Sequence, residues 1–218
     1  MYRDLSQPIE TGMQTFPGDP DVSVEPVATA DSEGYRVSRL GCSTHTGTHI
    51  DAPTHVGLEG SIDSFGLDRF VFDARVIDCT AFDAREPIGP AVLPDDDGGG
   101  MVVLETGWER FWGTARYREH PYLTPEAADR CVEAGWSVGL DTLNPDPTPG
   151  ENAAPGEPEG VPAHRRLLGN DLFVVENLRN LGGLDRCRLF AVPLSIVDGD
   201  GSPVRAFAAA GSGVRGGR

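Results

Sequence analysis

Short apolar runs dominate the chain, and proline or glycine separates most of them. Residues 35–46, "YRVSRLGCSTHT", alternate between apolar and polar side chains, which is typical of a half-buried strand. Further apolar runs predict buried strands at 72–80, 100–108, 136–142, 172–178 and 189–196. Short strands are also expected between the turn signals of residues 4–27.

One segment carries clear helix signals. Residues 124–135, "TPEAADRCVEAG", begin with a threonine that can cap the first turn, continue with Pro125 and Glu126, and end at Gly135. Residues 164–169, "HRRLLG", predict a second, short helical segment. Strands thus outnumber helices, and we expect a mixed α/β (α+β) domain whose mixed or barrel-like β core is flanked by helices.

Segments rich in turn residues mark the loops and the end of the chain. Residues 144–162 contain six prolines and three glycines, which predicts an irregular loop or lid. "DDDGGG" at 95–100 predicts an exposed turn, and "GSGVRGGR" at 211–218 predicts a frayed tail. We therefore expect one domain over residues 1–210, followed by a flexible tail at 211–218.

Composition narrows the classes of partner. With 218 residues and 39% hydrophobic content, the chain suits one domain, or two small ones at most. Its formal net charge of −16 would repel nucleic acid phosphates and anionic membranes. No apolar run approaches the roughly 20 residues of a membrane helix, and the first residues lack a signal-peptide pattern. We expect a cytoplasmic protein that binds neither nucleic acid nor membrane.

The acidity itself has two explanations. Every basic residue other than histidine is arginine, and lysine is absent. A strongly acidic surface suits a halophilic protein, because salt screens charge repulsion within about 3 Å at 1 M. Lack of lysine is equally typical of a GC-rich genome, so composition leaves both explanations open.

The cysteines argue against a thiolate metal site. Cys42, Cys79, Cys131 and Cys187 are far apart, and no two of them form a C-x-x-C pair. We expect four free, buried thiols.

Candidate metal chemistry concentrates in residues 43–55, "STHTGTHIDAPTH", which hold three of the five histidines. Threonine, glycine and proline make a helix unfavourable here. In an extended chain, alternate residues share one face. That face would carry the residues at odd positions, namely His45, Gly47, His49, Asp51, Pro53 and His55.

A straight strand would still not gather these side chains. The Cα atoms of His45 and His49 would lie about 13 Å apart, at roughly 3.3 Å per residue, whereas a metal holds histidine nitrogens at about 2.0–2.1 Å. Gly47 permits the necessary bend, and Pro53 can turn the chain before His55. Neighbouring histidines often bind nothing, but three with an aspartate favour a divalent metal, with Zn²⁺ fitting best and Mn²⁺ next.

The same segment resembles the H-x-G-T-H-x-D-x-P-x-H motif of the metal-dependent cyclase superfamily, which includes bacterial kynurenine formamidases and isatin hydrolases. It is present without a gap as "HTGTHIDAPTH". Six other stretches resemble the family in the same order, namely "DLSQPI", "FPGDP", "ARVIDCT", "HPYLTPEAADRCVEAGWSVGLDT", "PAHRRLLGNDLFVVENLRNL" and "DGSPVRAFA". The resemblance thus covers nearly the whole chain and implies the swivelling β/β/α fold of the cyclases.

The resemblance also implies roles for individual residues. His45, His49 and Asp51 would bind a first metal ion; His164 and Glu176 would join Asp51 at a second one in members with two metals. His55 would transfer protons beside the metals and could also bind them weakly. One or two ions, Zn²⁺ before Mn²⁺, and a homodimer or higher homo-oligomer are therefore expected.

From the residues alone, some of these assignments keep an alternative. His164 could equally be an ordinary loop histidine. Glu176 follows an apolar run, and either a metal or an arginine such as Arg179 would offset the cost of burying its carboxylate. His120 precedes Pro121, matches no ligand position of the motif, and is expected to be structural.

The implied activity is hydrolysis of a small amide by metal-activated water, with His55 passing a proton to the leaving amine. N-formylkynurenine is the first candidate substrate, and a cyclic amide or imide is the second. A metal-binding protein without turnover is a third interpretation, against which the intact His55 argues. Phe16, Trp108 and Trp112 could form aromatic walls of a pocket or pack in the core. Residues 141–160 depart from the "DTPSxD" run associated with formamidases, and this puts the substrate in doubt.

Overall fold

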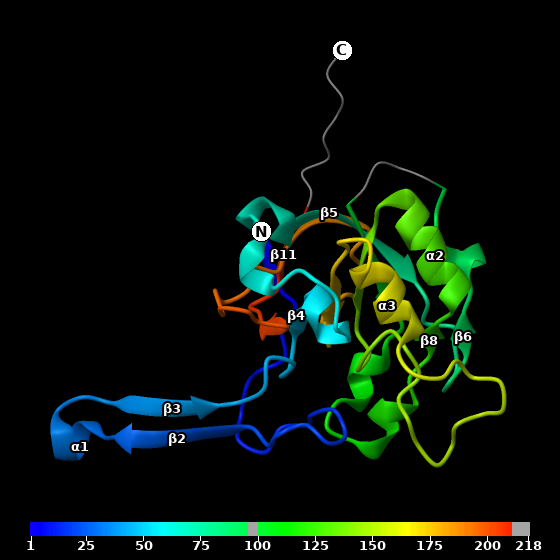
Figure 1. The fold of residues 1–218 in the computed structure, drawn as a ribbon. Coiled ribbons are helices and arrows are strands. Elements are labelled where there is room, and N and C mark those ends of the chain that lie inside the picture. Colours follow the sequence, from blue (N-terminus) through cyan, green and yellow to red (C-terminus); the bar gives the residue numbers. More distant parts are fainter. Residues whose placement is uncertain (96–99, 211–218) are drawn as a thin grey trace.

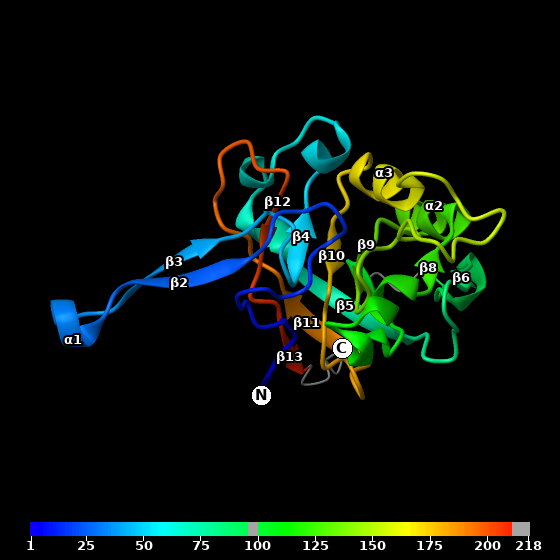
Figure 2. The same cartoon turned by 90° about the horizontal axis from the view of Figure 1, so that it is seen from below.

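The structure is a computed structural model that describes residues 1–95 and 100–210. Its centre is a nine-stranded sheet in the order β1-β13-β11-β5-β7-β9-β10-β4-β12, which curls into a half-barrel (Figures 1 and 2). The four central strands run parallel, and antiparallel strands extend the sheet on both sides. The predicted single mixed α/β domain with a barrel-like core is thus confirmed.

The strands of this sheet are short and come from the whole chain. Their bounds are β1 Tyr2–Asp4, β4 His49–Asp51, β5 Val71–Asp78, β7 Met101–Glu105, β9 Ser137–Leu140, β10 Val174–Glu176, β11 Arg186–Phe190, β12 Gly201–Pro203 and β13 Phe207–Ala210. Two small sheets pair β2 Ser23–Ala28 with β3 Val37–Gly41, and β6 Pro87–Ile88 with β8 Tyr122–Leu123.

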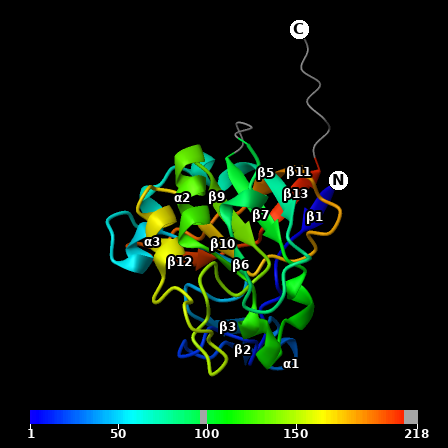
Figure 3. The ribbon, with the colours of Figure 1, turned by 90° about the vertical axis from the view of Figure 1, so that its right-hand side faces the viewer.

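Strands β7, β9 and β10 are buried over nearly their whole length and are mostly apolar, because both of their faces are covered. In β7, Met101 and Val103 face one hydrophobic cluster, whereas Val102 and Leu104 face a second cluster that includes residues of the helices. The helices α2 Pro125–Ala134 and α3 Pro162–Leu168 lie together on that second face (Figure 3). Strands predicted at 72–80, 100–108, 136–142 and 172–178 are confirmed within a few residues.

Helix α2 has the ends that its sequence predicts. The hydroxyl of Thr124 accepts a hydrogen bond from the Ala127 N–H, Pro125 occupies the first turn, and Gly135 ends the helix with a φ of +71°. The short helix expected at 164–169 is α3. Among the described residues, no helix is long and apolar enough to cross a membrane.

The strand expected at 189–196 is displaced toward the N-terminus. The observed strand is β11, Arg186–Phe190, and the chain leaves the sheet beyond it. Pro193 has no N–H for a ladder hydrogen bond, and it makes only an isolated bridge to Val204. Val192, Leu194 and Val197 lie exposed in the following loop.

A hairpin arm, residues 23–41, projects from the body (Figures 1 and 2). It consists of β2, β3 and the one-turn helix α1 Ala30–Glu33 at its tip. Within the described chain, these two strands pair only with each other. Five of its large hydrophobic side chains are exposed: Val24, Val27, Tyr35, Val37 and Leu40.

Six 3₁₀ helices complete the described fold, namely Pro53–Val56, Ile62–Ser64, Leu67–Phe70, Pro90–Val92, Trp108–Phe111 and Ala115–Glu119. The turn expected at 95–100 lies mostly outside the described residues, and the tail expected at 211–218 lies wholly outside them. The boundary between domain and tail therefore stays a prediction.

Candidate metal centre

The histidine segment is not one extended wall. Residues 44–48 turn and bend, with Gly47 at a φ of +60°, and only His49–Asp51 form a strand, β4. Pro53 then starts the 3₁₀ helix that carries His55. The predicted single face is wrong at both ends, but the bend at Gly47 and the turn at Pro53 are confirmed. Bending brings the ring centroids of His45 and His49 to 5.1 Å, which a straight strand would not allow.

A first group of candidate ligands lies within this segment. The Oδ1 atom of Asp51 is 2.8 Å from Nδ1 of His45 and 3.3 Å from Nε2 of His49. Each of the three residues offers a ligand atom, and these atoms lie within 4.8 Å of one another. The group therefore has the size and the nitrogen–oxygen donor set that a divalent ion requires.

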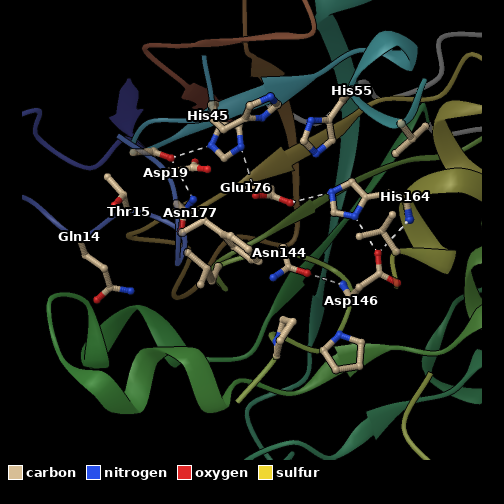
Figure 4. Close-up of a pocket in the computed structure, with 18 of the residues that line it drawn as sticks. Gln14, Thr15, Asp19, His45, His55, Asn144, Asp146, His164, Glu176 and Asn177 are labelled. Carbon is tan, nitrogen blue, oxygen red and sulfur yellow. Dashed lines mark hydrogen bonds and ion pairs between the residues drawn. The ribbon is translucent and has the colours of Figure 1, made fainter. Parts of the chain in front are cut away.

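A second group shares Asp51 and recruits two residues from distant segments. His164 on α3 places Nε2 at 3.0 Å from Oε1 of Glu176, and at 3.5 Å from Oδ2 of Asp51. Glu176 stands at the end of β10 beside β4, and its carboxylate faces His164 (Figure 4). Its Oε2 is 3.2 Å from Nε2 of His49. The structure thus brings all five predicted ligands together, although their binding of metal stays a prediction.

The second group has an unmet need for a cation. Asp51 is fully buried, and its Oδ2 atom is buried without a hydrogen-bond partner among the described residues. Burial opposes a charge on His49 and His164, yet neighbouring carboxylates hold the pKa of both well above the ordinary value. The carboxylates thus favour positive charge between these groups, from protonated histidines or from a metal, and the residues of the first and of the second group fit a divalent ion.

Each ligand histidine also has a partner on its other ring nitrogen. Nδ1 of His49 is 2.9 Å from the Gly47 carbonyl oxygen, and Nε2 of His45 is 3.2 Å from Oδ2 of Asp200. Nδ1 of His164 is 2.7 Å from Oδ2 of Asp146. For His49 and His164, such a partner fixes which nitrogen faces a metal.

Two of these partners, Asp146 and Asp200, escape the sequence analysis. Asp146 lies in the irregular loop, yet it also accepts hydrogen bonds from the backbone N–H groups of Ala163 and His164. It therefore caps α3 from outside the usual capping position, and no local pattern marks it. Asp200 lies in "DGDG", which looks like an ordinary turn.

The side chain of Asn177 holds the Gly47 carbonyl by a hydrogen bond. Its Nδ2 donates to that carbonyl oxygen at 3.0 Å, and its Oδ1 accepts from the hydroxyl of Tyr117 at 3.0 Å. Asn177 adopts a φ of +57°, a conformation that asparagine tolerates better than most residues. Its position directly after Glu176 is the one sequence signal that could have found it.

His55 differs from the ligand histidines. It is exposed, and its ring lies 4.0 Å from that of His45 and 5.5 Å from that of His164, centroid to centroid. Partial burial and the neighbouring histidines lower its pKa, although Asp51 and Glu176 act in the opposite direction. His55 is therefore a neutral imidazole at pH 7, able to accept a proton beside the candidate ligands.

A cavity of about 510 Å³ opens next to the candidate ligands. Phe16 and Trp112 line it, whereas Trp108 is buried in a small core with Tyr117 and Leu143. Of the two uses left open for each residue, Phe16 and Trp112 take the cavity wall and Trp108 takes the core. Six residues of the loop at 144–162 also line the cavity, namely Asn144, Asp146, Pro147, Pro149, Gly160 and Val161.

The remaining candidates are structural. His120 is buried and its two ring nitrogens contact the Pro121 carbonyl oxygen and the hydroxyl of Thr148. Three cysteines are free and buried as predicted, but Cys42 is exposed because it follows β3 where the arm joins the body.

Two known relatives match this chain over most of its length. The kynurenine formamidase of Salinibacter ruber is 33% identical over 215 residues, covering 93% of this chain and 94% of that protein. The kynurenine formamidase of Bacillus cytotoxicus is 30% identical over 213 residues, covering 94% and 95%.

Solved structures agree with the fold. Isatin hydrolase A from Ralstonia solanacearum superposes with a TM-score of 0.83 at 26% identity, covering 95% of this chain and 91% of that one. Isatin hydrolase A from Labrenzia aggregata gives a TM-score of 0.81 at 27% identity, covering 95% and 93%. A profile described as "Putative cyclase" matches residues 3–147, which include the histidine segment, so this chain belongs to the cyclase family.

Proposed function

We propose that this chain is a metal-dependent arylformamidase that hydrolyses N-formylkynurenine to kynurenine and formate. One observation carries the proposal: the buried ligand groups that share Asp51 open onto a cavity with aromatic walls at Phe16 and Trp112. The relatives called kynurenine formamidase, which match over 90% of the chain, support this substrate.

Zn²⁺ is the ion that suits these donors best, with Mn²⁺ second. His45, His49 and Asp51 would hold one ion, and Asp51, His164 and Glu176 a second. A divalent ion bound there would lower the pKa of a bound water to about 7 and would polarise the substrate carbonyl.

The chain's own residues do the rest. His55, neutral and beside the ligands, accepts a proton from the attacking water and passes it to the aniline nitrogen as the amide C–N bond breaks. Phe16 and Trp112 hold the aromatic ring, and the loop at 144–162 limits the access of bulk water. Formate and the free amine then leave.

Hydrolysis of a cyclic amide is the second candidate, because the superposed solved structures include isatin hydrolases. The test is kcat/KM for N-formylkynurenine and for isatin with Zn²⁺-loaded protein. We expect a preference of at least about tenfold for N-formylkynurenine. A tenfold preference for isatin, about 1.4 kcal/mol, would instead assign a cyclic amide, and turnover of neither would favour a metal-binding protein without catalysis.

We also propose a homodimer or higher homo-oligomer. The hairpin arm supports this, since an isolated two-stranded hairpin is marginally stable in water and its apolar side chains Val24 and Leu40 are exposed. Sedimentation equilibrium should give at least a dimer, and Leu40→Glu should shift it toward the monomer. A monomeric wild-type protein would contradict the proposal. Residence in the cytoplasm stays a prediction.

A further inference from the structure

A third group of potential ligands lies outside the two groups assigned above. His45, His55 and Asp200 each offer a ligand atom, and these atoms lie within 4.8 Å of one another. Nε2 of His45 is 3.2 Å from Oδ2 of Asp200, and the other oxygen of Asp200 accepts a hydrogen bond of 2.7 Å from the Thr44 hydroxyl. The hydroxyl holds the carboxylate toward His45.

The three groups form a continuous chain, because neighbouring groups share a residue. Asp51 belongs to the second and the first group, with Oδ2 facing His164 and Oδ1 facing His45 and His49. His45 belongs to the first and the third group, with Nδ1 facing Asp51 and Nε2 facing Asp200. Because Nδ1 and Nε2 of His45 point in different directions, one nitrogen must release an ion before the other binds it, and the next group then lies within reach.

Exposure rises along this chain. The side chain of Asp51 is 0% exposed, that of His45 is 15% exposed, and that of Asp200 is 43% exposed. All three residues of the second group are buried, whereas His55 in the third group is exposed. An ion in the third group can keep several waters, but an ion in the second group must give up most of them.

We propose that His45, His55 and Asp200 form an outer loading site, where a divalent cation binds before His45 passes it to the buried groups. The physical reason is dehydration: a cation that enters a buried site in one step loses its waters before it gains ligands, which is costly. Stepwise replacement of water by ligands lowers that barrier. The proposal rests on the metal dependence proposed above, and it is independent of the substrate.

Asp200 could instead act only as a hydrogen-bond acceptor that orients His45. The two roles differ in what they change. Loss of an orienting partner weakens equilibrium affinity, typically 10–100-fold. Loss of a loading site raises the free-energy barrier between the free and the bound ion. Uptake and release of the ion then slow by the same factor, and the dissociation constant does not change.

The test uses the full-length protein with Asp200→Asn, which keeps the size of the side chain and removes its charge. Zn²⁺ release from the loaded protein is measured with excess chromophoric chelator, and Zn²⁺ uptake by the stripped protein is measured by stopped flow. Electrostatic steering by a charged site changes entry rates by about 10–10³. We expect both rates to fall by on the order of tenfold, and the Kd to stay within about threefold.

Two further variants control the experiment. Asp198→Asn removes an exposed carboxylate from the same loop and should leave both rates unchanged, because the ligand groups do not include Asp198. Thr44→Val keeps the charge but releases the carboxylate of Asp200, and it should slow both rates by a smaller factor. If Asp200→Asn did not fold, Thr44→Val would still decide the question.

The outcomes separate this proposal from the proposed function. Faster release with a weaker Kd in Asp200→Asn would show that Asp200 orients His45, and unchanged rates would show that it has no part in exchange; either result overturns the loading site alone. A wild-type protein that binds no Zn²⁺ would overturn the metal dependence itself.

Discussion

Asp146 uses one carboxylate to hold both the first turn of α3 and the ring of His164, so Asp146→Asn should weaken the fold and the metal site together. The carboxylate is buried and accepts three hydrogen bonds, from the Ala163 N–H at 2.8 Å, the His164 N–H at 3.1 Å and His164 Nδ1 at 2.7 Å. Asparagine offers one oxygen and one NH₂ group at these positions. At least one of the buried donors must then face another donor.

The expected cost follows from these contacts. A buried donor without an acceptor costs about 1–3 kcal/mol, and loss of charge from the remaining hydrogen bonds adds about 1 kcal/mol. We expect the free energy of unfolding to fall by about 2–4 kcal/mol in urea with chelator present. If the NH₂ group faces Nδ1 of His164, the proton moves to Nε2, the nitrogen that faces Glu176. Zn²⁺ affinity should then fall by about 10–100-fold.

Asp129→Asn on α2 is the matched control. Asp129 contacts Arg166 of α3 at 2.8 Å, but both side chains are more than one-third exposed. Exposed ion pairs of this kind contribute about 0–1 kcal/mol, and the Zn²⁺ affinity should not change. If Asp146→Asn matched the control in both unfolding and Zn²⁺ competition, the capping and orienting roles of Asp146 would be wrong.

Four other results are expected. His55→Ala should lower kcat by roughly 10²–10⁴ while Zn²⁺ stays bound at equilibrium, and unchanged turnover would exclude proton transfer by His55. Trp112→Ala should raise KM for an aromatic substrate and leave the protein folded, whereas Trp108→Ala should lower the free energy of unfolding by about 3–5 kcal/mol. Loss of stability in Trp112→Ala and a raised KM in stable Trp108→Ala would contradict the assignment of Trp112 to the cavity wall and of Trp108 to the core. Burial lowers the pKa of His120 to about 4, so the unfolded chain gains a proton first as pH falls from 6.5. The stability that wild type loses between pH 7 and pH 4 should exceed the loss in His120→Gln by about 3 kcal/mol, and equal losses would refute this. The melting temperature should rise from low to molar salt because repulsion is screened, and a flat or falling curve would leave only genome composition to explain the missing lysine.

Helices and strands whose ends and burial depend on nearby residues could be predicted from the sequence. Helix α2 carries its own cap, proline and terminal glycine, and strands β7, β9 and β10 are mostly apolar because both of their faces are covered. The motif likewise holds three candidate ligands within seven residues, from His45 to Asp51. A resemblance was needed to reach His164 and Glu176.

Contacts between distant segments could not be predicted in the same way. Asp146 and Asp200 lie in irregular loops without a hydrophobic pattern. Their partners, His164 and His45, are distant in the sequence, so the fold is needed to find these contacts. Trp108 and Trp112 are chemically alike and four positions apart, so burial alone separates core from cavity wall. Pro193 shortened a strand whose apolar run was otherwise convincing.

The register of β4 against β10 limits where related proteins can carry insertions or deletions. His49 lies opposite Glu176 and Asp51 opposite Val174, so an insertion of one residue within either strand would turn the ligands to the other face of the sheet. Insertions in the arm at 23–41 or in the loop at 144–162 leave that pairing intact. Length variation should therefore accumulate in the arm and in the loop at 144–162, while the spacing within the two ligand strands stays fixed. In that loop, which lines the cavity, it would alter the choice of substrate.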